Sequence, residues 1–254
     1  MANMSTDQVN ALTTSQVSYL SNAVVTNLST DKVAALSTGQ VAKLTATQMT
    51  VLNTNQLATI GTTGVTALTS TQLNALNATQ LTGFDTAMVN LMSSAQVQGW
   101  TAAVVTSLGT DQVAALTTSA MQGLSGAQII AMTTSQVDAL DTAGISTLSA
   151  AQVQALEIAD FAALSSTKIA LLSTSQLPQL ELRDVAVLSS TQIGALSSSQ
   201  LNSLNTQQIG ALTTAQVAAL TTTQVAALSV GQLNLLSEDQ IQSLTSAQIG
   251  AIPT

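Results

Sequence analysis

The sequence contains no histidine and no cysteine. The lack of histidine removes the commonest general base and metal ligand, and the lack of cysteine removes disulfides, zinc–thiolate sites and thiol nucleophiles. Serine is abundant, but a serine nucleophile needs an adjacent base to activate it. We therefore expect no enzyme, no catalytic residue, no metal site and no bound cofactor.

Charged residues make up only 6% of the 254 residues, and twelve acids against four cations give a net charge of −8. The cations, Lys32, Lys43, Lys168 and Arg183, are scattered along the chain. Four dispersed cations cannot neutralise a phosphate track, so nucleic acid is not an expected partner. No run approaches the length of a membrane span, and residues 1–5 lack the basic and apolar segments of a signal peptide. We expect no membrane insertion.

Two apolar columns run through the sequence with a period of eight residues. Every residue at positions 4, 12, 20 and onward to 252 is apolar, and most of these positions hold leucine. A second column runs from Val9 to Ile249 and is apolar at every position. We call these the Leu column and the Val column. Such regular self-similarity is typical of solenoids and other repeat proteins.

Two polar columns complete the octad. Position 5 and every eighth position after it hold mainly Ser or Thr, the types that favour the helix N-cap. The position three places further on is mainly glutamine, which forms the Gln column. Ser/Thr-x-x-Gln is a capping box, and the flanking Leu and Val column residues form a hydrophobic staple. Each octad therefore starts a new helix, and neutral Gln in place of Glu avoids a column of like charges.

These columns predict an all-α solenoid of very short helices, one per octad. In one continuous helix the Leu column would drift by about 80° per octad and could bury no constant face. Helices this short are unstable alone, so successive octads must stack. We predict a single solenoid over residues 1–254 with about 31 octads, no separate capping domains and about 2.5–3 octads per coil. A β-solenoid with a corner between the two apolar columns is the alternative.

Two longer periods are visible. Val24, Gly64, Val104, Gly144 and Asp184 interrupt the Gln column at every fifth octad, which suggests a duplicated unit of five octads. A period of three octads is indicated by unusual residue pairs at the cap and the first helical position. These pairs are Glu157 with Ile158, Glu181 with Leu182, and Ser229 with Val230.

Glu157, Asp160, Glu181 and Asp184 form the densest acidic group, close in sequence to Lys168 and Arg183. A carboxylate dyad or cation site is one interpretation. Asp160 and Asp184 occupy the Gln column, and Glu157 and Glu181 occupy the cap column. We therefore favour a solvated role at helix starts, where the helix dipole stabilises acids.

Phe84, Met88, Met92 and Trp100 are large residues that cluster in the sequence, and three of them stand in the Leu column. A ligand pocket is one interpretation, but their register predicts a locally wider core. Tyr19 lies outside both apolar columns, and we expect it to be partly exposed.

The repeats Thr213–Leu220 and Thr221–Leu228, TTAQVAAL and TTTQVAAL, resemble Leu/Gln/Thr-rich octapeptide stretches of very large bacterial surface or secreted proteins. Such proteins are often labelled adhesins or haem-utilisation proteins. The absence of histidine argues against a haem role, because the usual axial ligand is missing. The resemblance implies an extracellular or cell-surface location.

We expect a structural spacer or scaffold, with self-association or flanking repeats as the partners. The pattern starts at Met4 and still runs at Ile252, so we expect open apolar ends that stack into filaments or matrix. The alternative is surface recognition of ice or a polysaccharide by Thr and Ser columns. The residues that follow the Val column, such as Ala34, Thr50 and Asn74, are mixed and favour the spacer.

Overall fold

The computed structural model describes residues 4–252. The chain divides into two compact units, Met1–Ala139 and Leu140–Thr254, and each is described by itself. The octad pattern of the sequence continues through residues 139 and 140 without a break. Pro253, in the cap column, lies outside the described residues.

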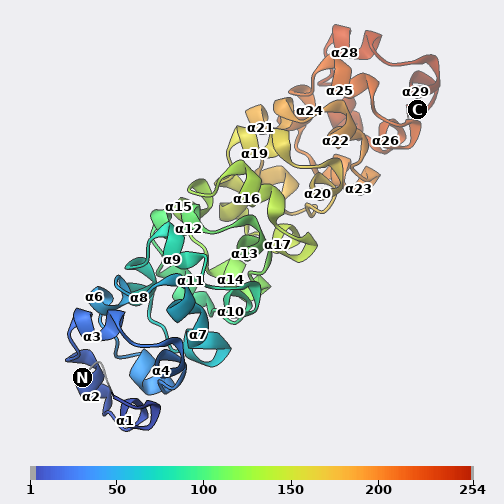
Figure 1. The fold of residues 1–254 in the computed structure, drawn as a ribbon. Coiled ribbons are helices and arrows are strands. Elements are labelled where there is room, and N and C mark those ends of the chain that lie inside the picture. Colours follow the sequence, from blue (N-terminus) through green and yellow to red (C-terminus); the bar gives the residue numbers. More distant parts are fainter. Residues whose placement is uncertain (1–3, 253–254) are drawn as a thin grey trace. The chain divides into compact units, whose positions relative to one another are not determined.

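The first unit is built from short helices, one for each octad (Figure 1). One helix, α7, spans two octads because Gly61, with φ 65° at the cap position, joins them across a kink. The helices are α1 Thr6–Asn10, α2 Thr14–Ser18, α3 Asn22–Thr26, α4 Thr30–Ala34, α5 Thr38–Val41, α6 Ala46–Met49, α7 Thr54–Val65, α8 Ser70–Asn74, α9 Ala78–Leu81, α10 Thr86–Asn90, α11 Ser94–Gln98, α12 Ala102–Ser107, α13 Thr110–Ala114, α14 Thr118–Gly123, α15 Gly126–Ile130 and α16 Thr134–Ala139.

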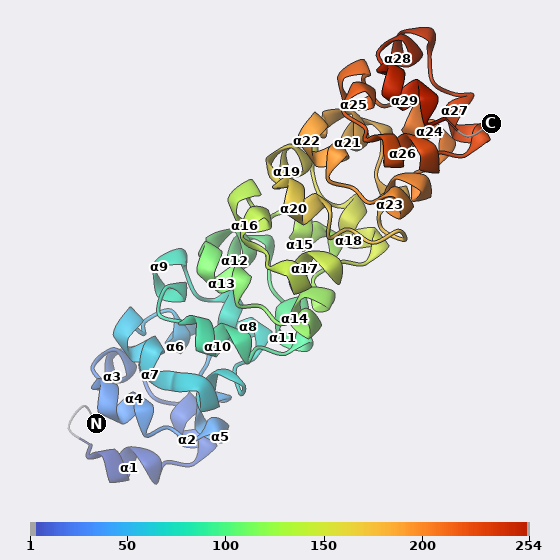
Figure 2. The ribbon, with the colours of Figure 1, turned by 90° about the vertical axis from the view of Figure 1, so that its right-hand side faces the viewer.

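The second unit repeats the same short helices (Figure 2). It has one 3₁₀ turn, where Pro178 follows Leu177. Its helices are α17 Thr142–Ser146, α18 Ala150–Gln154, α19 Ile158–Ala163, α20 Ser166–Ile169, η1 Leu177–Gln179, α21 Leu182–Val187, α22 Ser190–Gly194, α23 Ser198–Ser203, α24 Thr206–Gly210, α25 Thr214–Ala218, α26 Thr222–Ala227, α27 Val230–Leu233, α28 Glu238–Gln242 and α29 Ser246–Gly250. Residues 4–252 contain no strand, so the β-solenoid alternative is wrong.

The octad that contains α25 shows why the sequence folds this way. The Thr213 hydroxyl accepts a hydrogen bond from the Gln216 backbone N–H at 3.2 Å, and the Gln216 Oε1 accepts one from the Thr213 N–H at 2.6 Å. This reciprocal pair satisfies two of the N–H groups that a helix start leaves free. The helix ends when Leu220, the next Leu-column residue, donates its N–H to the Val217 carbonyl at 3.2 Å. The predicted capping box is confirmed.

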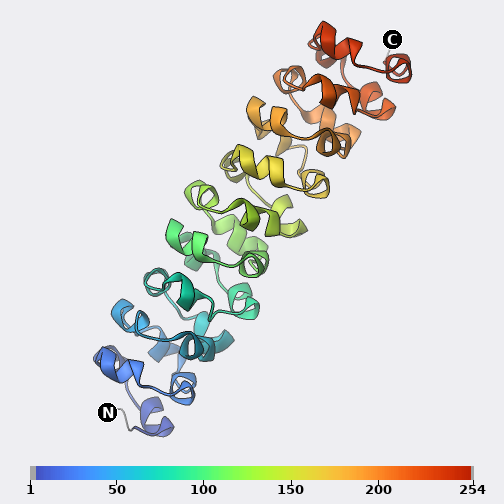
Figure 3. The ribbon, with the colours of Figure 1, turned by 45° about the horizontal axis from the view of Figure 1, so that its top comes forward.

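Stacking occurs every three octads, so each coil consists of three short helices. In the first unit α2 packs on α5 and α10 on α13; in the second α19 packs on α21 and α21 on α24. Figure 3 shows the coils of each unit as successive layers of short helices. The all-α solenoid is confirmed, with three octads per coil. An interval of five octads therefore places successive interruptions of the Gln column on different faces.

The two apolar columns form the core of each unit. Every Val-column residue from Val9 to Val225 is buried, and so is every Leu-column residue from Leu20 to Leu228 except Leu36. Burial of each such side chain stabilises the fold by about 1.5–3 kcal/mol. No helix among residues 4–252 is long and apolar enough to cross a membrane.

Candidate functional site

The Gln column makes the most specific contacts in the structure. The Gln216 Oε1 caps its own helix, while its Nε2 donates to the carbonyls of Val185 at 2.9 Å and Leu188 at 2.5 Å. Both acceptors lie in the preceding coil, at sequence separations of 31 and 28. One buried amide therefore starts a helix and also ties it to the coil on which it stacks. We call this arrangement the glutamine tie.

Nine glutamines in the first unit make the tie to the Leu-column carbonyl, at 2.6–2.9 Å: Gln40, Gln48, Gln56, Gln72, Gln80, Gln96, Gln112, Gln128 and Gln136. In the second unit the corresponding distance is 2.5–2.8 Å for Gln176, Gln192, Gln200, Gln208, Gln216, Gln224, Gln232 and Gln248. Gln240 makes the same bond to the Leu212 carbonyl. The tie is thus the general rule of this fold.

The tie supplies a hydrogen-bond donor that the buried backbone needs. The Leu-column residue stands between two helices, so its carbonyl falls outside the regular helical hydrogen-bond ladder. Leaving such a buried carbonyl unpaired costs about 1–3 kcal/mol. A glutamate could still cap the helix, but its carboxylate would point a second acceptor at the two carbonyls. Donor capacity is therefore a stronger reason for Gln than the repulsion between charges suggested by the sequence.

Sequence reasoning missed this second role of the glutamines. The octad pattern does not show which coil lies above which, so acceptors in the preceding coil carry no local signal. The hydrogen-bonding needs of the backbone do point to it. Each Leu-column carbonyl must be buried with its side chain and needs a donor, and the Gln column is the one column that supplies a side-chain N–H in nearly every coil.

The acids in the Gln column are buried, which corrects the predicted solvated role. Asp160 is 3% exposed and Asp184 is 4% exposed. They do serve helix starts as predicted: the Asp160 carboxylate accepts from the Glu157 N–H at 3.0 Å, and that of Asp184 from the Glu181 N–H at 2.9 Å. Burial raises the pKa of Asp184 above its usual value. The hydrogen bond from the Glu181 backbone and the charge of Arg183 lower this pKa, while the charge of Glu181 raises it.

The outer charges of this group lie at the surface. Glu157 and Glu181 are exposed, and Arg183 Nε lies 2.7 Å from Glu181 Oε2 at the surface. An exposed pair of this kind contributes little to stability. No group of three or more His, Cys, Asp or Glu residues that could hold a metal is found among residues 4–252.

The large residues of the first unit are core residues, as predicted. Phe84, Met88, Met92 and Trp100 are all between 2% and 5% exposed. The indole N–H of Trp100 is the one buried side-chain polar atom without a hydrogen-bond partner in the described part of the chain. Tyr19 is 87% exposed, and the prediction that it lies outside the core is confirmed.

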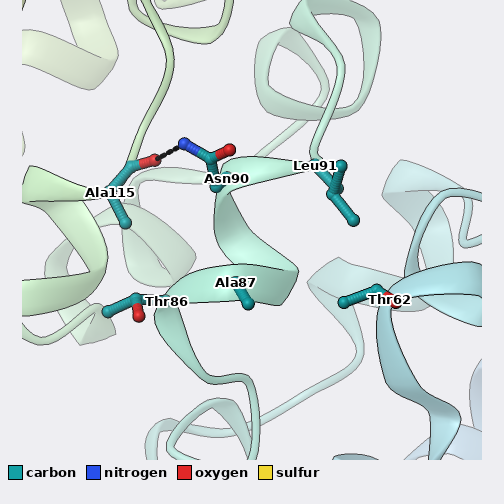
Figure 4. A pocket seen from close by; sticks show the side chains of 6 residues that line it. All are labelled: Thr62, Thr86, Ala87, Asn90, Leu91 and Ala115. Atoms are coloured by element: carbon teal, nitrogen blue, oxygen red, sulfur yellow. Dashed lines mark hydrogen bonds between the residues drawn. The ribbon is translucent and has the colours of Figure 1, made fainter.

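One face of the first unit carries a column of threonines. Its helices are α2, α5, the second half of α7, α10, α13 and α16, and the first helical residue is threonine in each: Thr14, Thr38, Thr62, Thr86, Thr110 and Thr134. The first five are exposed and Thr134 is half-buried. Figure 4 shows Thr62 and Thr86 beside a shallow, open depression that is also lined by Ala87, Asn90, Leu91 and Ala115. The Asn90 amide there donates to the Ala115 carbonyl at 3.1 Å.

Comparison with protein families finds a repeat that matches part of these octads. The sequence model of the ALTTAQ repeat matches residues 177–214 and 201–230. This is a repeat-containing protein. The letters ALTTAQ themselves stand at residues 211–216, and they comprise the cap Thr213 and the tie residue Gln216. A search of curated proteins finds no match to the chain.

The ALTTAQ match therefore covers a helix start and an inter-coil hydrogen bond. Within residues 177–230 the Gln column begins with Asp184 and continues with ties made by Gln192, Gln200, Gln208, Gln216 and Gln224. The repeat defines how a coil is built and stacked.

Proposed function

We propose that the chain is a structural spacer or scaffold segment of an extracellular bacterial protein. The glutamine tie carries this proposal, because it fastens one coil to the next with the same buried hydrogen bonds. The described residues gather no group of His, Cys, Asp or Glu side chains that could hold a metal. The cell-surface context is supported by the resemblance of the octads to repeats of adhesin-like proteins.

A spacer of this kind must hold a constant distance per coil. The chain has no cysteine, so introduced cysteines give unique spin-label sites. Ser190, Thr214 and Glu238 begin the stacked helices α22, α25 and α28. We expect the 190–238 distance to be twice the 190–214 distance, with narrow distributions, in pulsed electron spin resonance. Broad distributions would contradict a rigid spacer. Fractionation of cells that make the native protein tests the location separately.

We further propose that coils add end to end. Gln8 and Gln16 are exposed, and each caps its own helix through Oε1 at 2.8 Å, with the amide N–H groups directed away from the cap. By the 28-residue separation of the tie, the carbonyls of Leu228, Leu236 and Leu244 are the acceptors that the next ties would reach. Further octads or a second copy would complete this edge equally well. Open-ended growth of rods with concentration, seen by light scattering and electron microscopy, tests association; a monomer at high concentration contradicts it.

The threonine column favours a second candidate function, recognition of a regular surface such as ice or a polysaccharide. Six successive coils place a hydroxyl at the same position of one face, which is the geometry that a periodic ligand requires. The test is ice recrystallisation and polysaccharide pull-down with the Thr62→Lys/Thr86→Lys variant. The matched control replaces Ala78 and Ala102 by lysine; these are the exposed first residues of α9 and α12, on another face. Equal activity of both variants would exclude the threonine column.

A further inference from the structure

The second unit has one apolar face. Its stacked helices α19, α21, α24 and α27 form what we call the Glu157 face. Among residues 140–252, five large aliphatic side chains are exposed, and four of them lie on this face: Ile158, Leu182, Val230 and Leu235. The fifth, Ile249, belongs to the last helix, α29. The residue pairs that recur every three octads in the sequence thus form an apolar stripe on one side of this unit.

The stripe stands out against the other two faces of the same unit. Its first helical residues are Ile158, Leu182, Thr206 and Val230, with exposed fractions of 38%, 46% and 67% for the three aliphatic ones. The corresponding residues of the other two faces are almost all Ser, Thr or Ala. Small residues such as Ala162, Ala186 and Gly210 flank the stripe and leave its aliphatic side chains protruding. Exposed, aligned apolar side chains are typical of an interaction surface.

We propose that the Glu157 face is a dimerisation surface that binds the same face of a second copy in antiparallel orientation. A partner that contacts Ile158, Leu182 and Val230 together must present apolar groups at the spacing of the coils. Another copy of this solenoid has that spacing, because it carries the same face on the same stacked helices α19, α21, α24 and α27. A two-fold axis between α21 and α24 pairs α19 with α27 of the partner, and α21 with α24.

Charge selects the antiparallel orientation. The caps of the first two helices are Glu157 and Glu181, while those of the last two are the neutral Asn205 and Ser229. Parallel stacking would place Glu157 of one copy against Glu157 of the other, which is repulsive, while Glu181 is partly neutralised by its ion pair with Arg183. Antiparallel stacking places each glutamate against a neutral cap. Asn205 uses its Oδ1 to cap its own helix at 2.9 Å, and its amide N–H groups can donate to Glu181 of the second copy.

Sedimentation equilibrium of the complete chain tests the dimer. Leu182→Glu changes an exposed residue at the first helical position, where an acid is favoured by the helix dipole, so the fold is expected to persist. We expect the dissociation constant to rise by about tenfold or more, since apolar anchors at the centre of an interface dominate its affinity. The control is Thr214→Glu, the same position of α25 on another face. Circular dichroism checks that both variants fold.

Orientation is tested by cross-linking a mixture of Ile158→Cys chains and Val230→Cys chains. The antiparallel dimer predicts disulfides between unlike chains, because residue 158 of one copy faces residue 230 of the other. Disulfides mainly between two Ile158→Cys chains would overturn the orientation. A wild-type chain without a dimer, or a Leu182→Glu chain that dimerises like the wild type, would overturn the proposal. A closed dimer is distinct from the open-ended rods of end-to-end stacking, so the two associations can fail independently.

Discussion

Replacement of one tie residue by glutamate separates helix capping from coil stacking. Gln208 is fully buried; its Oε1 accepts from the Asn205 N–H at 2.8 Å, and its Nε2 donates to the carbonyls of Leu177 at 3.1 Å and Leu180 at 2.7 Å. Gln208→Glu preserves the capping acceptor and removes both donated bonds. If capping were the whole role, the change would be harmless or stabilising, because acids are favoured in the first helical turn.

The tie predicts a large loss instead. The Leu180 carbonyl loses its donor, at about 1–3 kcal/mol, the Leu177 carbonyl keeps only the backbone N–H of Leu180, and a carboxylate is buried against both. We expect Gln208→Glu to lower the free energy of unfolding by about 4 kcal/mol at neutral pH, measured by urea denaturation and far-ultraviolet circular dichroism. The loss should shrink as the pH falls, because burial raises the pKa of the introduced carboxyl and its protonated form is neutral and can donate.

Gln16→Glu is the matched control. Gln16 caps its helix in the same way, through Oε1 at 2.8 Å from the Thr13 N–H, but it is exposed. This change should alter the free energy of unfolding by only a few tenths of a kcal/mol. Equal effects of Gln16→Glu and Gln208→Glu would refute the tie as a stabilising contact.

Five further substitutions test three other parts of the fold by the same denaturation assay. Leu140→Asp places a charge in the core, where Leu140 is 1% exposed, and should lower the free energy of unfolding by several kcal/mol. Thr142→Asp, at an exposed first helical position, should be nearly neutral. Equal losses would mean that the columns are misassigned. Asp184→Gln should stabilise the chain by about 1–3 kcal/mol at neutral pH by supplying the missing donor. The folded-state pKa of Asp184 is raised, so the native carboxylate destabilises the fold above that pKa. The stability gained by Asp184→Gln should therefore shrink as the pH falls toward the ordinary pKa value of 3.8. A gain that grows with acidity would contradict this. Gly123→Ala should destabilise the fold, because its Cβ would lie 2.8 Å from the Ser94 carbonyl oxygen, while Gly250→Ala, with no atom within 4 Å, should be neutral or stabilising.

Most of the fold follows from local chemistry that is visible in the sequence. Thr213 and Gln216 predict a helix start through their spacing, and the Leu and Val columns predict which side chains are buried, because both signals act within one octad. The sequence limits the number of octads per coil to about 2.5–3 but does not determine it, because that number depends on how the short helices close around the core. Only residue pairs such as Glu157 with Ile158 indicate the three-octad period.

The surfaces and the buried acids could not be predicted in the same way. The Thr14 to Thr134 column is spread over six coils and becomes visible only when the sequence is written in rows of three octads. The sequence places Asp184 in solvent because acids are rarely buried. The structure buries it because its position belongs to the tie, where most of the glutamines are buried as well.

The tie also controls how such a sequence can change in length. Insertion or loss of one octad leaves every glutamine at the same sequence separation from a Leu-column carbonyl, because each column is restored after eight residues. The helix starts, the ties and the core survive, but everything beyond the change rotates by one third of a turn. Deletion of residues 189–196, for example, would move Thr206 and Val230 off the face that carries Ile158 and Leu182. Copy-number variation in steps of one octad is therefore nearly neutral for folding, while selection on any one face can retain only steps of three octads.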